Sequence, residues 1–435
     1  MKRPGEAARA AALALAEAVL VKGQPLDDAI RKAQAAGGRL ATLEPRDRAF
    51  ARLVVTTVLR RLGQIDTALA ACLDRPLKGR ALRVREILRL AAAQLLFLET
   101  PPHAAVDAAV RQAARFPAYR GLVNAVLRRL AAEAKTLLEH QDQVRLNCPD
   151  WLWRSWSGAY GEAKAQDIVA QLLAEPPLDI TVRDAPEEWA GRLDARVLPT
   201  GSLRRLGGGA IETLPGYGQG AWWVQDTAAS LLAPLLGEVR GRRVLDLCAA
   251  PGGKTLQLAA AGARVTALDI SARRLELVAA NLARTGLEAE LIAADARQWR
   301  PESGFELILL DAPCTATGTI RRHPDIWRLK TAADVARMAI LQAELLAAAR
   351  AMLVPGGTVL YGCCSLEPVE GEAVIEAFLA ADPALRRQPI APAEIFGLET
   401  LLTPEGDLRT LPCHLGDSGG MDGFYAARLR LESQA

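Results

Sequence analysis

Cysteine and aspartate residues at the ends of apolar runs are the features of this 435-residue chain that suggest chemistry. Its seven cysteines stand at positions 72, 148, 248, 314, 363, 364 and 413. Cys248 lies in VLDLCAAPGGKT, Cys314 in LLDAPC, and the neighbours Cys363 and Cys364 in TVLYGCCS. A thiolate is a strong nucleophile where its surroundings lower its pKa, so Cys314 and the Cys363/Cys364 pair are candidate nucleophiles. An odd count without CxxC spacing argues against a disulfide framework or a metal site.

Three aspartates end neighbouring apolar runs: Asp269, Asp295 and Asp311. An acidic residue at a strand end can bind the ribose or adenine of a nucleoside cofactor, although helix capping is the commoner role. The run before Cys248 leads into a turn at Gly252 and Gly253, where backbone N–H groups are free for a ligand. This turn lacks the GxGxxG and Walker patterns, which favours a cofactor that carries a carboxylate and a sulfonium. Three acidic strand ends beside such a turn are hard to explain by capping alone.

The elements that must position these residues form an α/β arrangement over residues 236–432. Strands are predicted within RRVLDLCAA, ARVTALDI, EAELIAADA, FELILLDAP and GGTVLYGCC, and each of the first four is expected to lead into a helix. This alternation predicts a Rossmann-like, doubly wound and mostly parallel sheet with its ligands at the carboxyl ends of the strands.

The first 140 residues predict a different, all-α domain of six or seven helices. They carry 24 Lys and Arg against 13 Asp and Glu, whereas the whole chain has a net charge of only +3. A basic domain of this kind suits a polyanion, although solvated arginine faces explain the composition about as well. Residues 141–235 are expected to form a small α+β linker. We expect a cytoplasmic protein that has no membrane span and no metal. We expect most of its tryptophans to pack in cores rather than to stack on bases.

Three motifs, LDLCAAPGGKT, LLDAPCTATGTIRRHPDIW and YGCCSLEPVEGE, together resemble the RsmB family, also called Sun or Fmu. Its members are S-adenosylmethionine-dependent ribosomal RNA cytosine-5 methyltransferases. The segments GAWWVQDTAASLLAPLL and GGMDGFYAARLRL agree with this resemblance, and PPHAAVDAAVRQAAR and GLVNAVLRRL are similar to NusB-like RNA-binding domains. The resemblance implies ribosomal RNA as the partner and S-adenosylmethionine as the cofactor, and we expect a monomer.

The resemblance also implies roles for single residues. The cofactor would be held by Cys248, Ala249, Ala250, Pro251, Gly252, Gly253, Lys254, Asp269, Arg274, Asp295 and Asp311. Carbon 5 of cytosine is a weak nucleophile, and a thiolate that adds to carbon 6 activates it. The cysteine before the serine is the nucleophile in this family, which favours Cys364 over Cys314. Cys314 would then assist proton removal and product release, and Asp311 would position the base.

Several positions depart from the family pattern. Thr315 replaces a serine, Gly362 and Cys363 replace alanine and threonine, and Gly371 replaces an asparagine. Because side chains alternate along a strand, we expect Cys363 to be packed rather than catalytic.

A basic run after Cys314 supplies candidates for RNA phosphate contacts, namely Arg321, Arg322 and His323, with a solvated loop as the simpler interpretation. Two alternative functions stay open from the sequence. One is a non-catalytic RNA-binding factor that kept the fold, and the other is a methyltransferase that acts on DNA or transfer RNA.

Overall fold

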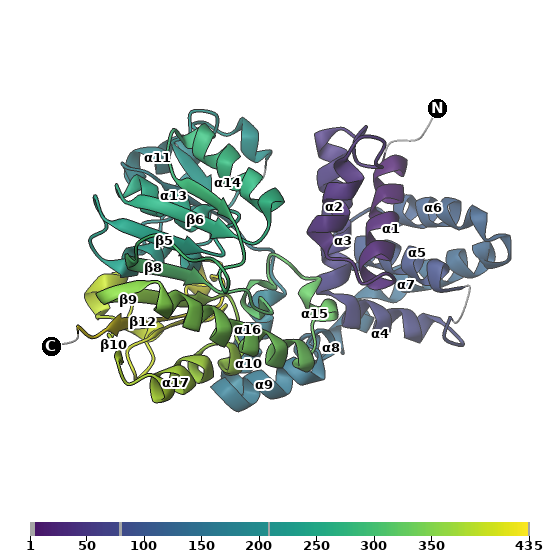
Figure 1. The fold of residues 1–435 in the computed structure, drawn as a ribbon. Coiled ribbons are helices and arrows are strands. Elements are labelled where there is room, and N and C mark those ends of the chain that lie inside the picture. Colours follow the sequence, from purple (N-terminus) through teal and green to yellow (C-terminus); the bar gives the residue numbers. More distant parts are fainter. Residues whose placement is uncertain (1–4, 78–80, 208, 434–435) are drawn as a thin grey trace. The chain divides into compact units, whose positions relative to one another are not determined.

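The computed structural model describes residues 5–77, 81–207 and 209–433, which divide into two compact units (Figure 1). A helical unit comprises Met1–Leu173 together with Arg322–Lys330. A sheet unit comprises Ala174–Arg321 and Thr331–Ala435. This division differs from the predicted boundaries at 140 and 235, because residues 141–173 belong to the helices and the linker belongs to the sheet unit.

The helical unit is rich in Ala, Leu and Arg, which are strong helix formers. Its core consists of alanine, valine and leucine side chains such as Leu59, Leu88 and Leu127, all 0% exposed. The helices are α1 (Glu6–Leu20), α2 (Leu26–Gln34), α3 (Pro45–Arg60), α4 (Leu62–Cys72), α5 (Leu82–Leu96), α6 (Pro102–Gln112), α7 (Arg120–Glu139), α8 (Gln143–Asn147), α9 (Asp150–Tyr160) and α10 (Glu162–Leu172). The predicted all-α N-terminal domain is therefore confirmed.

The short helix α8 explains why the helical unit continues past residue 140. The Asn147 side chain accepts hydrogen bonds from the backbone N–H groups of Gly63 and Gln64, at 3.1 and 3.2 Å. A Cβ at Gly63 would lie 1.7 Å from the Leu146 carbonyl oxygen, so only glycine permits this close approach of α8 to α4. These bonds satisfy N–H groups at the start of α4, which has no capping side chain of its own.

The segment Arg322–Lys330 also belongs to the helical unit although it lies far along the chain. It contains α15 (Ile326–Leu329). Trp327 packs against Trp156 with ring centroids 5.9 Å apart, and Asp325 accepts a hydrogen bond from the Leu26 backbone N–H at 3.0 Å. Buried aromatic area and a buried hydrogen bond thus fix this segment in the helical core.

The sheet unit begins with a small antiparallel sheet whose strand order is β2-β3-β1-β4. Its elements are β1 (Leu178–Val182), α11 (Pro186–Leu193), β2 (Ala195–Val197), β3 (Leu203–Arg205) and β4 (Trp222–Val224). Trp222 fills the core beneath this sheet together with Ile180 and Leu203. The chain then passes through α12 (Thr227–Ser230) and η5 (Ala233–Leu236) into the main sheet.

The main sheet has the order β10-β12-β9-β8-β5-β6-β7, with β11 paired to β12. Strands β5 to β9 are parallel, and β10, β11 and β12 run antiparallel to their neighbours. The strands are β5 (Arg243–Leu247), β6 (Arg264–Asp269), β7 (Glu290–Ala293), β8 (Phe305–Asp311), β9 (Leu353–Cys363), β10 (Leu385–Arg387), β11 (Leu408–Thr410) and β12 (Phe424–Leu431). The order reverses between β5 and β8, and ligands bind at such a switch point in sheets of this kind.

Both faces of this sheet are buried. Along β8, Ile308 and Leu310 belong to one core cluster and Leu307 and Leu309 to another, as alternation along a strand requires. The covering helices are α13 (Gly253–Ala260), α14 (Ala272–Thr285), α16 (Ala332–Ala351) and α17 (Glu372–Ala381) (Figure 1).

The predicted α/β class and the five predicted parallel strands are confirmed. One detail was wrong, because β7 leads to β8 through turns at residues 294–304 and not through a helix. Among the residues that the structure describes, no helix combines the length and apolar character that a membrane crossing needs.

Candidate functional site

Two cysteines meet at the carboxyl edge of the main sheet. Strands β8 and β9 are parallel neighbours in which Asp311 lies opposite Gly362, so the loops that follow them leave the sheet side by side. These loops bring Cys314 Sγ to 3.3 Å from Cys364 Sγ, and both side chains are half-buried. Fifty residues of sequence therefore separate two thiols that are in contact.

The contact between the two sulfurs affects the protonation of Cys314. The hydrogen bond to Cys364 raises the pKa of Cys314 well above its usual value, and burial adds to the rise. Cys314 therefore keeps its proton in this arrangement and meets Cys364 as a neutral thiol.

The neighbouring Cys363 points away from this pair into the core. Its side chain is 0% exposed, and its Sγ donates to the Glu370 carbonyl oxygen at 3.3 Å. Burial raises the pKa of Cys363 well above its usual value, so it remains a neutral thiol. The alternation along β9 thus places it as the sequence predicts.

The turn after β5 lies at the switch point beside the cysteines. Cys248 and Gly252 both have left-handed backbone conformations, with φ of 61° and 106°. A Cβ at Gly252 would lie 3.1 Å from Val278 Cγ1, so this glycine also permits α14 to pack closely. Burial raises the pKa of Cys248 to about 12, which keeps this third thiol protonated.

Asp269 and Arg274 join this turn in one hydrogen-bond network. The Asp269 carboxylate accepts bonds from the backbone N–H groups of Ala250 and Ser271, at 3.2 and 2.9 Å, and pairs with Arg274 at 3.3 Å. The Arg274 guanidinium also donates to the Ala250 carbonyl oxygen. Next to Asp269, the side chain of Ile270 is 69% exposed although it is apolar. Sequence reasoning did not single out Ile270, which lies exposed beside the Asp269 network.

Asp295 follows β7, and its carboxylate is already paired. Arg297 donates to both carboxylate oxygens through its side chain, at 2.7 to 3.2 Å, and also contacts Glu344. The hydrogen bonds from Arg297 lower the pKa of Asp295, so it is a carboxylate. The Ala294 backbone N–H donates to the Asp269 carbonyl oxygen at 3.2 Å, which places this segment next to the Asp269 network.

Asp311 forms an ion pair with Lys254, the second residue of α13. Lys254 Nζ lies 2.7 Å from Asp311 Oδ2 and 5.1 Å from the centroid of the Phe424 ring. Burial would lower the pKa of Lys254, but the charge and hydrogen bond of Asp311 outweigh it and raise the pKa. The sequence places Lys254 in the turn after β5 but does not indicate that it pairs with Asp311, which stands at the end of β8.

The basic run after Cys314 is divided by the structure. Arg321 is 1% exposed and lies 3.0 Å from Asp422 and 3.5 Å from Asp226. The prediction that Arg321 contacts RNA was therefore wrong, because its guanidinium serves a buried ion-pair cluster instead. Arg322 and His323 belong to the helical unit, where His323 is 41% exposed and lies 3.2 Å from Asp27.

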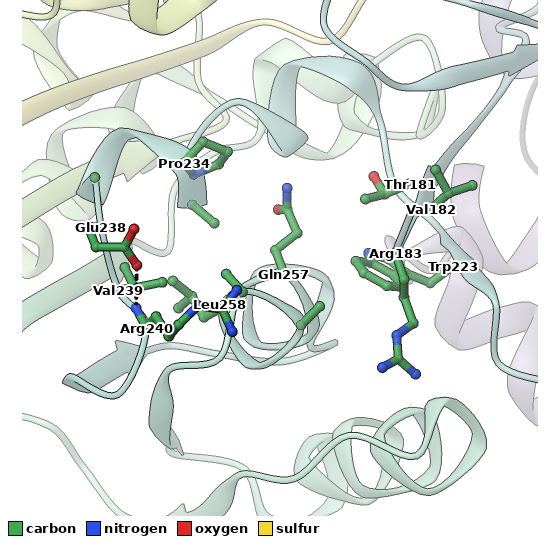
Figure 2. Close-up of a pocket in the computed structure, with 14 residues that line it drawn as sticks. Thr181, Val182, Arg183, Trp223, Pro234, Glu238, Val239, Arg240, Gln257 and Leu258 are labelled. Carbon is green, nitrogen blue, oxygen red and sulfur yellow. Dashed lines mark hydrogen bonds between the residues drawn. The ribbon is translucent and has the colours of Figure 1, made fainter. Parts of the chain in front are cut away.

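A separate pocket of about 460 Å³ lies at the other end of α13 (Figure 2). Its lining includes Arg183, Trp223, Arg240 and Gln257. None of the cysteines or strand-end aspartates lines it, so the candidate site is defined by its chemistry and not by this pocket.

Fold and site together define an S-adenosylmethionine-dependent methyltransferase with a NusB-like helical domain. Residues 231–430 match the model of the 16S rRNA methyltransferase RsmB/F family, and residues 6–132 match that of the NusB family. The chain belongs to the RsmB/F family of ribosomal RNA methyltransferases.

Relatives of similar length support this membership. The ribosomal RNA small subunit methyltransferase B of Pseudomonas syringae pv. tomato is 38% identical over 412 residues, which cover 90% of this chain and 91% of that protein. The protein of the same name from Klebsiella pneumoniae subsp. pneumoniae is 36% identical, with 95% of each chain covered. The crystal structure of PH0851 has the same fold, with a TM-score of 0.74, 23% identity and 99% of both chains covered.

Two of the departures from the family pattern, Gly362 and Gly371, lie where side chains of other elements pack closely. A Cβ at Gly362 would lie 2.4 Å from Leu232 Cδ2, and a Cβ at Gly371 would lie 2.7 Å from Arg409 Nη2. Side chains of other elements therefore occupy the space that alanine and asparagine would need at these positions.

Proposed function

We propose that this chain methylates carbon 5 of a cytosine in small-subunit ribosomal RNA, through a covalent bond between Cys364 and the base. The observation that carries this proposal is the contact of Cys364 with Cys314 at 3.3 Å, beside the Lys254–Asp311 ion pair. One sulfur can form a bond to the base while the second acts on the same ring. The names of the relatives, which specify the small ribosomal subunit, support the choice of RNA.

The residues around the turn fit S-adenosylmethionine. The helix α13 begins at Gly253, and its first backbone N–H groups are suited to the carboxylate of the methionine part. Asp269 stands at the end of β6, where a carboxylate can accept bonds from ribose hydroxyls, with Arg274 beside it. Ile270 and Asp295 are suited to the face and the edge of the adenine. When bound, this cofactor supplies an electrophilic methyl group on a sulfonium.

Cys364 starts the reaction as a thiolate that bonds to carbon 6 of the cytosine and breaks the double bond between carbons 5 and 6. The negative charge that enters the ring makes carbon 5 nucleophilic, so carbon 5 can take the methyl group. Asp311, which Lys254 holds, is suited to accept a hydrogen bond from the amino group of the cytosine and to orient the ring.

Cys314 completes the reaction. Once Cys364 is bonded to carbon, the hydrogen bond that raises the pKa of Cys314 is lost, and Cys314 can release its proton to solvent. As a thiolate, Cys314 then removes the proton on carbon 5, the double bond re-forms and Cys364 leaves as a thiolate. The pair returns to its starting state, with one sulfur protonated. Because the mechanism needs free thiols, we place it in the reducing cytoplasm.

Bisulfite sequencing of ribosomal RNA tests this proposal. Cells that lack the gene should lose protection at one cytosine of the small-subunit RNA, and the wild-type gene should restore it. An unchanged bisulfite pattern in all ribosomal RNA would contradict the ribosomal assignment. A lost site in transfer RNA or DNA would move the activity to that substrate.

A further inference from the structure

Glu370 is a buried carboxylate that the mechanism does not use. It ends η7 (Pro368–Glu370), six residues after Cys364, and its side chain is 0% exposed. Its Oε1 accepts hydrogen bonds from the Thr315 backbone N–H at 2.8 Å and from Gln342 Nε2 at 3.3 Å. Its Oε2 accepts from the Thr315 hydroxyl and from the Ser365 hydroxyl, the latter at 2.5 Å. Burial raises the pKa of Glu370, and the hydrogen bonds from Ser365 and Thr315 oppose this rise.

Two of the three residues that donate to Glu370 are chain neighbours of the two catalytic cysteines. Thr315 follows Cys314 directly, and Ser365 follows Cys364 directly. One carboxylate therefore ties the loop after β8 to the loop after β9. Gln342 strengthens the first tie, because its side chain also donates to the Pro313 carbonyl oxygen at 2.9 Å.

Further bonds join the same two loops. The Gly318 backbone N–H donates to the Cys364 carbonyl oxygen at 3.0 Å, and Thr317 Oγ1 accepts from the Leu366 backbone N–H at 2.9 Å. The first bond reaches the backbone of Cys364 from a residue four positions after Cys314, and the second joins residues that follow both cysteines. Glu370 differs from both because it contacts the residue directly after each cysteine. The carboxylate thus links the two positions that directly follow the sulfur-bearing residues, which themselves touch through Thr315 Oγ1 and Ser365 Oγ at 3.3 Å.

We propose that Glu370 is a positioning residue that holds the Cys314 and Cys364 sulfurs at the separation which addition and release require. This positioning role rests on the proposed function, in which both sulfurs act on the same base. Both thiols must reach one base, and a displacement of about 1 Å can cost about 100-fold in rate. Glutamine has nearly the same volume as glutamate but replaces one acceptor oxygen by a donor, so it cannot accept all these bonds.

Glu370→Gln in the full chain tests the proposal by a readout that needs no methyl transfer. Diamide accepts two hydrogens and joins two nearby thiols as a disulfide, and peptide mapping quantifies the Cys314–Cys364 product. We expect this disulfide to form at least about tenfold more slowly in Glu370→Gln, because the sulfurs are no longer held together. The matched control is Glu376→Gln on α17, whose side chain is 59% exposed and which should keep the wild-type rate.

Methyl transfer provides the second readout. In Glu370→Gln we expect kcat to fall at least about tenfold, with KM for RNA and for S-adenosylmethionine within about twofold of wild type. A purely structural role would instead lower the active fraction and leave the disulfide rate of the folded fraction unchanged. Wild-type rates of both disulfide formation and methyl transfer in Glu370→Gln would overturn the proposal.

A milder variant covers the case in which Glu370→Gln does not fold. Thr315→Val keeps the shape of the side chain and removes one hydroxyl donor to the carboxylate. Thr315→Val should also slow formation of the Cys314–Cys364 disulfide, as Glu370→Gln does. An unchanged rate in folded Thr315→Val would overturn the proposal. If wild-type protein forms the disulfide rapidly but methylates no RNA, the proposed function fails while the positioning role stands.

Discussion

Asp246 allows a quantitative test of the electrostatics at the base of the site. It lies in β5, is 0% exposed, and accepts a hydrogen bond from the Thr255 hydroxyl at 2.6 Å. Its Oδ1 has no hydrogen-bond partner within the described part of the chain. Burial raises the pKa of Asp246 from 3.8 to about 7, and the Thr255 bond only partly opposes this. The folded protein therefore keeps a proton that the unfolded chain releases between about pH 4 and pH 7.

The magnitude follows from this shift. Each pKa unit corresponds to about 1.4 kcal/mol, so ionisation of Asp246 costs the folded state about 4 kcal/mol above pH 7. This destabilisation of the folded state is absent below about pH 4, grows as the pH rises and is complete above the pKa that Asp246 has in the folded protein. Asp246→Asn mimics the protonated carboxyl at every pH and keeps an acceptor for Thr255. We expect its advantage in unfolding free energy over wild type to widen by about 1.4 kcal/mol per unit between pH 5 and 7.

Urea unfolding of both proteins at pH 5, 6, 7 and 8 measures this difference. The exposed Asp184→Asn makes the same chemical change at the surface of the same unit and serves as the control. A difference between Asp246→Asn and wild type that does not vary with pH would refute the reasoning. So would a variant that is less stable than wild type at pH 8.

Three further substitutions test other parts of the account. Lys254→Met removes the partner of Asp311, and we expect kcat to fall about 100-fold in a methyl-transfer assay while the protein stays folded by circular dichroism. Arg321→Leu removes the buried guanidinium that faces Asp226 and Asp422, so we expect a loss of about 3 to 5 kcal/mol in urea unfolding, and a loss of RNA affinity without destabilisation would contradict this. Cys363→Thr changes a buried side chain that only donates to a backbone carbonyl, so methyl transfer should stay within about threefold of wild type; complete loss would assign chemistry to Cys363.

The sequence predicts the fold class well because the signals for it are local. Apolar runs of five to eight residues mark the parallel strands, and the carboxyl ends of those strands bring Asp269, Asp311 and the cysteines to one edge. The alternation along β9 also predicts which way Cys363 and Cys364 point. These conclusions need only the neighbouring residues.

The parts that the sequence does not predict depend on distant partners. Arg321 stands in a basic run that resembles an exposed loop, and only its aspartate partners from other segments reveal a buried ion-pair cluster. Glu370 has no local pattern that indicates its role, because Thr315 and Gln342 come from elements far from it in the chain. The segment Arg322–Lys330 gives no local sign that it joins the helical unit. Such contacts follow from tertiary packing.

The assignment of the two sulfurs is the central claim, and adduct trapping tests it most directly. Cys364→Ala and Cys314→Ala are each incubated with S-adenosylmethionine and small-subunit RNA, and covalent protein–RNA adducts are separated on denaturing gels. The account predicts no adduct and no methyl transfer with Cys364→Ala, and a stable methylated adduct with Cys314→Ala, because bond formation succeeds and release fails. An adduct that accumulates with Cys364→Ala and not with Cys314→Ala would contradict the account and exchange the two roles.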